Sequence, residues 1–201
     1  MIIFSAIVPH PPLLLPQVGS EEDRKKVKKT LDSLNVLAEK FKEADPETIV
    51  ISSPHQDWGF NVPLHFLAKD FKGETKTFLT SFKSPKEHFE AGRIFFENLE
   101  KDKRYALIAS GDLSHCLKEE GPYEFHPDGL KFDQALQKYL TEKDVDKLLK
   151  LDEEFPGAGE CGLNSFSFLL GILEASGADW RTKILSYEGP FGVGYLVAQL
   201  I

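Results

Sequence analysis

Three short apolar runs, each followed at once by a polar loop, constrain the fold of this chain more than any other feature. The runs cover residues 2–8 (IIFSAIV), 48–52 (TIVIS) and 105–110 (YALIAS). Short continuous apolar runs of this kind are typical of strands that are buried on both faces, as in parallel sheets. Apolar residues at helical spacing lie between the first two runs, from Val27 to Phe41. Strands that alternate with helices predict an α/β fold built around a layered sheet.

The rest of the chain continues this alternation. Ser20 is suited to begin the first helix, because acidic residues follow it directly. We expect two strands between Phe60 and Phe82, since this stretch is rich in β-branched and aromatic residues. Further helices are predicted at residues 85–99, at 127–151 with a break near 141, and at 163–175; further strands are predicted at 183–189 and 193–201.

Composition narrows the class of protein. The 201 residues are 41% hydrophobic and 28% charged, which is typical of a globular chain, and we expect one domain over residues 1–201. The net charge of −8 argues against a general nucleic-acid binder, which needs cations to displace phosphate counterions. No stretch reaches the roughly 20 apolar residues of a membrane helix. Two cysteines make no disulfide framework, so we expect a soluble, cytoplasmic protein.

A histidine follows each of the three apolar runs. His10 lies in VPHPP, His55 in SSPHQDW and His115 in SGDLSH. In open α/β sheets, ligands bind beyond the carboxyl ends of the strands. If the three strands are parallel, their histidines converge on one edge of the sheet. The prolines next to His10 and His55 stiffen those loops, as a metal ligand requires.

A fourth element, PGAGECGLNS, offers two further donors between glycines. Glu160 and Cys161 are adjacent there, just before the helix predicted at 163–175. Two histidines and a carboxylate form the facial triad of non-haem Fe(II) enzymes, whereas two histidines and a cysteine suit zinc, or a redox-silent iron or copper site. We favour Glu160 as the third ligand, because an inward carboxylate needs a metal and an inward thiol does not.

Other residues near these motifs are candidates for supporting roles. Asp112, in GDLSH, could orient His115 or accept a hydrogen bond from the backbone of the turn. Trp58, Phe60 and Tyr123 could line an aromatic pocket, although core packing is the more common duty for at least one of them.

The segments AIVPHPPLLLPQVG, ISSPHQDW, SGDLSH and GPFGVGYLVA together resemble the class III extradiol dioxygenases of the LigB superfamily. Within that superfamily they are most similar to the proteins called AmmeMemoRadiSam system protein B and to Memo. The resemblance runs from the first predicted strand to the last. It implies a three-layer α/β/α domain around a mixed, largely parallel sheet, with a metal at one sheet edge.

The resemblance also implies roles for the candidate residues. His10 and His55 match the two metal-binding histidines, and His115 matches the acid and base beside the metal. The third ligand falls in GECG: a glutamate in ring-cleaving members, which corresponds to Glu160, or a cysteine before glycine in Memo-like members, which corresponds to Cys161.

The implied activity is ring cleavage of a catechol-type aromatic diol by O₂ at Fe(II), with Zn or Cu as the other metals the ligands allow. A Memo-like, non-catalytic protein that binds a metal or a partner is the main alternative. A zinc hydrolase using the same ligands is a weaker one. We expect a small aromatic diol as partner rather than a nucleic acid or a membrane. The sequence leaves open whether the chain forms a homo-oligomer.

Overall fold

The centre of the molecule is a six-stranded sheet in the order β3-β2-β4-β1-β6-β5. A computed structural model describes all residues, 1–201. The strands are β1 (Ile2–Val8), β2 (Thr48–Ser53), β3 (Glu74–Leu79), β4 (Tyr105–Ser110), β5 (Lys183–Glu188) and β6 (Tyr195–Gln199). Strands β3, β2, β4 and β1 run parallel, whereas β6 is antiparallel to both β1 and β5. The sheet is therefore mixed and largely parallel, which confirms the prediction.

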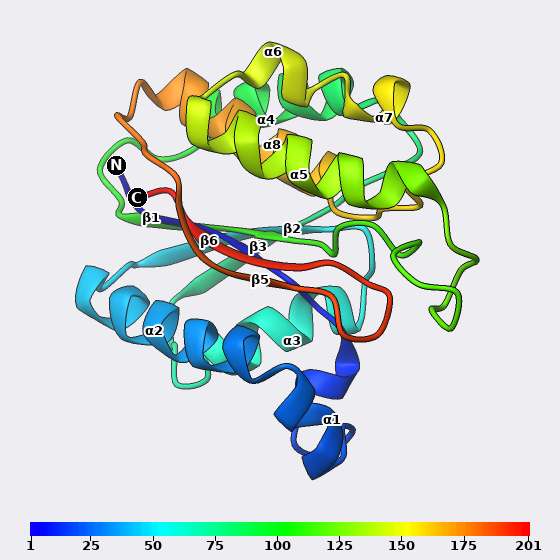
Figure 1. Ribbon diagram of the computed structural model, residues 1–201. Coiled ribbons are helices and arrows are strands. Elements are labelled where there is room, and N and C mark those ends of the chain that lie inside the picture. Colours follow the sequence, from blue (N-terminus) through cyan, green and yellow to red (C-terminus); the bar gives the residue numbers. More distant parts are fainter.

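Helices cover both faces of the sheet and complete the expected three layers. One layer holds α2 and α3; the other holds α4, α8 and α5, with α6 and α7 beside them, and the short helix α1 projects from the first layer (Figure 1). The helical elements are η1 (Pro12–Leu14), α1 (Glu21–Lys26), α2 (Lys28–Ala44), α3 (Trp58–Leu67), α4 (Pro85–Glu97), α5 (Pro127–Glu142), α6 (Val145–Leu148), α7 (Leu151–Glu154) and α8 (Leu163–Ser176). None of these helices is both long and apolar enough to cross a membrane.

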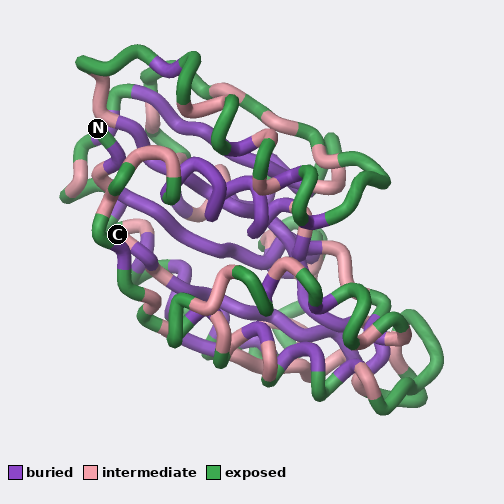
Figure 2. Tube along the Cα trace, turned by 90° about the horizontal axis from the view of Figure 1, so that it is seen from above, coloured by how far each residue is buried: buried purple, intermediate pink, exposed green.

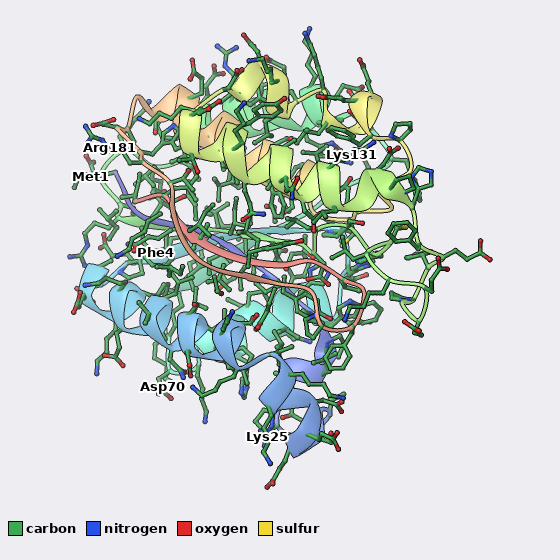
Figure 3. All side chains as sticks on the ribbon, viewed as in Figure 1. Met1, Phe4, Lys25, Asp70, Lys131 and Arg181 are labelled. Carbon is green, nitrogen blue, oxygen red and sulfur yellow. The ribbon has the colours of Figure 1, made fainter.

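Two apolar cores lie on the two faces of the sheet. Phe4 is in the core on the α2 side (Figure 3). Its ring meets that of Phe41 edge to face, with 5.6 Å between centroids. Phe166 and Phe168 of α8 belong to the core on the other side. The trace of the buried residues runs through the middle of the molecule, and the exposed residues form its outline (Figure 2). Burial on both faces explains why β1, β2 and β4 read as continuous apolar runs.

The prediction of two strands between Phe60 and Phe82 was wrong in its first half. Residues Trp58–Leu67 form helix α3, and only Glu74–Leu79 is a strand. The aromatic and β-branched residues favoured a strand, but Phe60, Pro63 and Leu67 follow helical spacing and are buried. Tertiary packing outweighed the local propensity here.

The first helical segment begins at Ser20, as predicted, and is then interrupted. The Ser20 hydroxyl accepts a hydrogen bond from the Asp23 N–H, while the Asp23 carboxylate accepts from the Ser20 N–H. The chain leaves helical geometry at Val27, and α2 starts afresh at Lys28. Glu188 of β5 accepts from the N–H and the hydroxyl of Thr30 at 2.7 Å each, and so satisfies a free donor of the new helix.

Candidate metal centre

The strand order explains why the three histidines meet. Strand β4 lies between β1 and β2, and these neighbours all run parallel, so the three loops leave the same edge of the sheet. His10 comes two residues after β1 and His55 two residues after β2, each directly after a proline. The two imidazole rings meet edge to face, 5.1 Å apart between centroids. The predicted convergence of these loops is thus present in the structure.

A chain of hydrogen bonds runs from the carbonyl of Gly59 through the hydroxyl of Ser110 to the ring of His10. Proline has no N–H to donate to the carbonyl four residues earlier in the helix, so the carbonyl of Gly59 is free. The hydroxyl of Ser110 donates to that carbonyl at 2.5 Å. Its only proton is then used, so toward His10 Nδ1, 2.9 Å away, the Ser110 oxygen accepts. Nδ1 therefore carries the ring proton, and Nε2 keeps its lone pair for a ligand.

The electrostatics of this region also prepare His10 as a neutral ligand. Its side chain is buried, and this burial, together with the nearby His55, lowers the pKa of His10 to about 3. A histidine must be unprotonated to bind a metal. His10 is already neutral at pH 7, so it does not have to release a proton when a metal binds.

Cys161 reaches the same point from the start of α8. Gly111 and Gly162 pack so closely that a methyl group on Gly111 would overlap the Cα of Gly162. The carbonyl of Asp112 accepts from the N–H of Gly162 at 3.0 Å, and the Asp112 N–H donates to Cys161 Sγ at 3.4 Å. Sγ thereby lies 3.6 Å from His10 Nε2. Burial raises the pKa of the Cys161 thiol well above its usual range.

Glu160 is directed elsewhere. Its carboxylate accepts a hydrogen bond from the N–H of Leu163 at 2.6 Å, within the first turn of α8. That position satisfies a free helix donor and places a carboxylate at the positive end of the helix dipole. Burial raises the pKa of Glu160 to about 7. Glu160 does not belong to either group of side chains that the structure brings within reach of one ion.

Two groups of side chains could each hold a metal ion, and both contain Cys161. One contains His10, His55 and Cys161, the other Asp112, His115 and Cys161, and within each group the ligand atoms lie within 4.8 Å of one another. A tetrahedral zinc with typical metal–nitrogen and metal–sulfur bonds separates two such ligands by about 3.6 Å. The 3.6 Å between His10 Nε2 and Cys161 Sγ matches this spacing. The residues present therefore fit a divalent metal that accepts nitrogen and sulfur ligands.

Asp112 connects the loop after β4 to the loop after β1. Its Oδ1 accepts a hydrogen bond from the backbone N–H of His10 at 3.0 Å, and its Oδ2 lies 3.9 Å from His10 Nε2. Asp112 thus accepts a backbone hydrogen bond, but from a neighbouring loop and not from its own turn. Burial raises the pKa of Asp112 to about 6. A carboxylate oxygen of Asp112 also lies within 4.8 Å of a ring nitrogen of His115, so Asp112 can influence that ring as well.

His115 faces the same centre on a longer loop. Its backbone N–H donates to the carbonyl of Gly159 at 3.2 Å. Its ring stacks against that of Tyr123, with 5.5 Å between centroids and planes 11° apart. Burial lowers the pKa of His115, and Asp112 partly opposes this effect. An imidazole with a pKa below 6.5 is neutral at pH 7 and can accept a proton.

The three aromatic candidates divide between the site and the core. Trp58 lies against His55, 5.0 Å between ring centroids, and Tyr123 lies against His115. Both of these side chains are exposed on their outer sides. Phe60, a residue of α3, is buried in the core on the α2 side of the sheet.

Sequence reasoning missed Asp133, a fully buried carboxylate behind the His115 loop. Asp133 Oδ1 accepts from the N–H of Ser114 at 2.9 Å, and Oδ2 accepts from the hydroxyl of Tyr187 at 2.6 Å. Gly194 makes room for it, because a methyl group there would overlap the carboxylate. Burial raises the pKa of Asp133 to about 7. The sequence did offer one signal for a buried carboxylate: an acidic residue stands next to Phe132, on the apolar face of α5.

Comparison with known proteins bears on the family and the fold of this chain. Residues 53–198 match the family described as the catalytic LigB subunit of aromatic ring-opening dioxygenase. His10 lies outside that range. Protein CA_C1420 of Clostridium acetobutylicum is 30% identical over 266 aligned residues, which cover 96% of this chain and 56% of that protein. The chain thus spans little more than half the length of this curated relative.

A solved structure shares the fold over almost the whole chain. The crystal structure of the uncharacterized protein JW3007 from Escherichia coli K12 superimposes with a TM-score of 0.66 and 16% sequence identity. The likeness covers 99% of this chain and 100% of that one. At this identity it supports the fold alone. The family match, which covers well over half of the sequence, goes further: the chain belongs to the LigB family.

Proposed function

We propose that this protein is a metal-dependent enzyme that binds a catechol-type aromatic diol and opens its ring with O₂. The metal is Fe(II), held by His10, His55 and Cys161, and His115 is the acid and base. The observation that carries the proposal is the convergence of these four side chains at the carboxyl edge of the parallel strands. The family match supports the reaction class.

Cys161 replaces Glu160 as the proposed third ligand. The thiol lies beside His10 Nε2, whereas the Glu160 carboxylate is engaged by the first turn of α8. A bound Fe(II) would supply Lewis acidity to the diol and a path for electrons between the diol and O₂. The protein's own groups then have to orient the substrate and move its protons.

The surroundings of His115 support its proposed role in proton transfer. Its ring is partly buried, keeps a pKa below the ordinary value and lies in one group with Asp112 and Cys161. We propose that it takes a proton from a substrate hydroxyl next to the metal and returns it later in the reaction. Tyr123 limits the rotation of the ring by stacking on it. Trp58, which lies against His55, and Tyr123, which lies against His115, offer aromatic surface for the substrate ring.

A second candidate is a Memo-like protein that binds a metal without catalysing ring cleavage. The specific observation in its favour is Cys161, because a thiol and not a carboxylate accompanies the two histidines. Thiolate ligands favour zinc, copper or redox-silent iron, so the ligand set supports this candidate, whereas the family match supports the enzyme. This candidate predicts the same metal ligands and no turnover.

One experiment separates the two candidates. The protein is loaded with Fe(II) without oxygen, mixed with a panel of catechols, and exposed to O₂ while the absorbance of coloured ring-opened products is recorded. The same protein loaded with Zn(II) is the control, because zinc has no redox chemistry. We expect product formation only with Fe(II). If metal binds with one equivalent per chain and no catechol is opened, the Memo-like candidate replaces the enzyme.

A further inference from the structure

The exposed aromatic side chains of this protein are concentrated at one edge of the sheet. Four are exposed: Trp58, Phe82, Tyr123 and Phe125. They belong to the segments that follow β2, β3 and β4, which are neighbours in the sheet and run parallel. The loops after β2 and β4 also carry His55 and His115. Trp58 and Tyr123 contact these two histidines, so their exposure is part of the site, whereas that of Phe82 still needs an explanation.

Phe82 is fully exposed although the backbone around it is held on both sides. The N–H of Ser81 donates to Nε2 of the buried His88 at 3.1 Å. The side-chain amide of Asn164 donates to the carbonyls of Ser81 and Lys83, at 3.2 and 3.1 Å. The exposure of the Phe82 ring is therefore a property of a well-braced turn and not of a loose segment.

The same contacts connect this turn to the segments that carry two of the proposed metal ligands. Asn164 lies in the first turn of α8, three residues after Cys161. On the other side of the turn, the N–H of Thr80 donates to the carbonyl of Ser53 at 2.9 Å. Ser53 Oγ in turn accepts from the N–H of His55 at 3.1 Å. Phe82 is thus held between the segments that present His55 and Cys161.

An exposed phenylalanine on a fixed turn forgoes one of the largest gains that a single side chain can make on burial. Contact with an apolar group of a ligand would recover that gain. We propose that Phe82 forms an apolar subsite for a substituent on the aromatic substrate, the part that does not reach the metal. The ligand class is a catechol with a bulky apolar or aryl substituent. This inference rests on the proposed function and adds to it a determinant of substrate choice.

The test compares a small and a large catechol on Zn(II)-loaded protein without oxygen, so that binding is measured without turnover. Dissociation constants of catechol and 4-phenylcatechol are determined from the change in catechol absorbance, for the wild type and for Phe82→Ala. We expect Phe82→Ala to weaken 4-phenylcatechol about tenfold and to leave catechol unchanged. Val36→Ala removes an exposed apolar side chain from α2 and serves as the matched control, with both constants unchanged. Zinc content is measured for each variant and should stay the same.

The possible failures point to different conclusions. If wild type binds both catechols and Phe82→Ala binds 4-phenylcatechol as tightly as wild type does, the subsite is overturned and the proposed function stands. Equal weakening of both catechols by Phe82→Ala also overturns the subsite, because the residue would then affect the common diol. If wild type binds neither catechol, the proposed function is overturned and the subsite with it.

Discussion

The loops that carry His10 and His55 differ from the loop that carries His115. The first two are short: residues 9–11 connect β1 to η1, and residues 54–57 connect β2 to α3. Each places a proline before its histidine. The loop after β4 is long, from residue 111 to 126, and holds its histidine through a backbone contact and a stacked tyrosine.

This difference suggests a division of labour. A metal needs ligands at fixed positions, and short proline-containing loops at strand ends provide them. A proton-transfer group must respond to the substrate, and a long loop allows this more readily. We therefore predict that changes in the short loops remove the metal, whereas changes in the long loop alter chemistry while the metal stays.

The largest effect is expected for His10→Ala. Loss of the proposed ligand atom Nε2 should lower metal affinity by more than about 100-fold, since even the outer partners of metal ligands contribute about 10–100-fold. Metal content after dialysis, measured by elemental analysis, checks this. His65→Ala, which removes a histidine of α3 outside the cluster, should retain the metal. Full occupancy in His10→Ala would contradict the role of the short loops.

The pair Cys161→Ser and Glu160→Gln decides the third ligand. Removing the thiol that lies 3.6 Å from His10 Nε2 should abolish most metal binding. Glu160→Gln should keep the metal, because that carboxylate contacts the first turn of α8, and should cost about 1 kcal/mol of stability through the weakened helix terminus. Titration with Co(II), which gives a visible thiolate band, reports on both variants. The reverse pattern would restore Glu160 as the ligand.

His115→Gln tests the long loop. We expect normal metal content and a loss of turnover of about 10²–10⁴-fold, the usual contribution of a general acid or base. Parallel metal analysis and product assays on one preparation measure both quantities. Loss of the metal in this variant would make His115 a ligand and remove the distinction between the two kinds of loop.

The smallest effect concerns the support beneath the long loop. Because the pKa of Asp133 is raised to about 7 in the folded protein, the folded state holds a proton that the unfolded state releases near pH 4. The free energy of unfolding should therefore fall as pH rises from about 4 to 7, at most by about 1.4 kcal/mol per pH unit from this group. In Asp133→Asn this share of the slope should disappear. Urea unfolding at a series of pH values measures it, and an unchanged slope would show that Asp133 does not titrate in this range.

Much of the site could be predicted from the sequence, because the relevant signals are local. Buried strands are recognisable from their composition, and the position of His10, His55 and His115 after them follows directly from the chain. Parallel neighbours then bring these loops to one edge, whatever the details of packing. The strand order that places β4 between β1 and β2 agrees with this expectation.

What the sequence could not decide depends on contacts between distant segments. Glu160 and Cys161 are adjacent, and only the close packing of Gly111 on Gly162 and the first turn of α8 determine which side chain faces His10. Likewise, Pro63 has no N–H and so leaves the carbonyl of Gly59 free. Only the folded chain brings the hydroxyl of Ser110, from another segment, to that carbonyl. Composition and spacing determine where strands end and which residues follow them. The direction of a side chain is decided by partners that only the folded chain brings together.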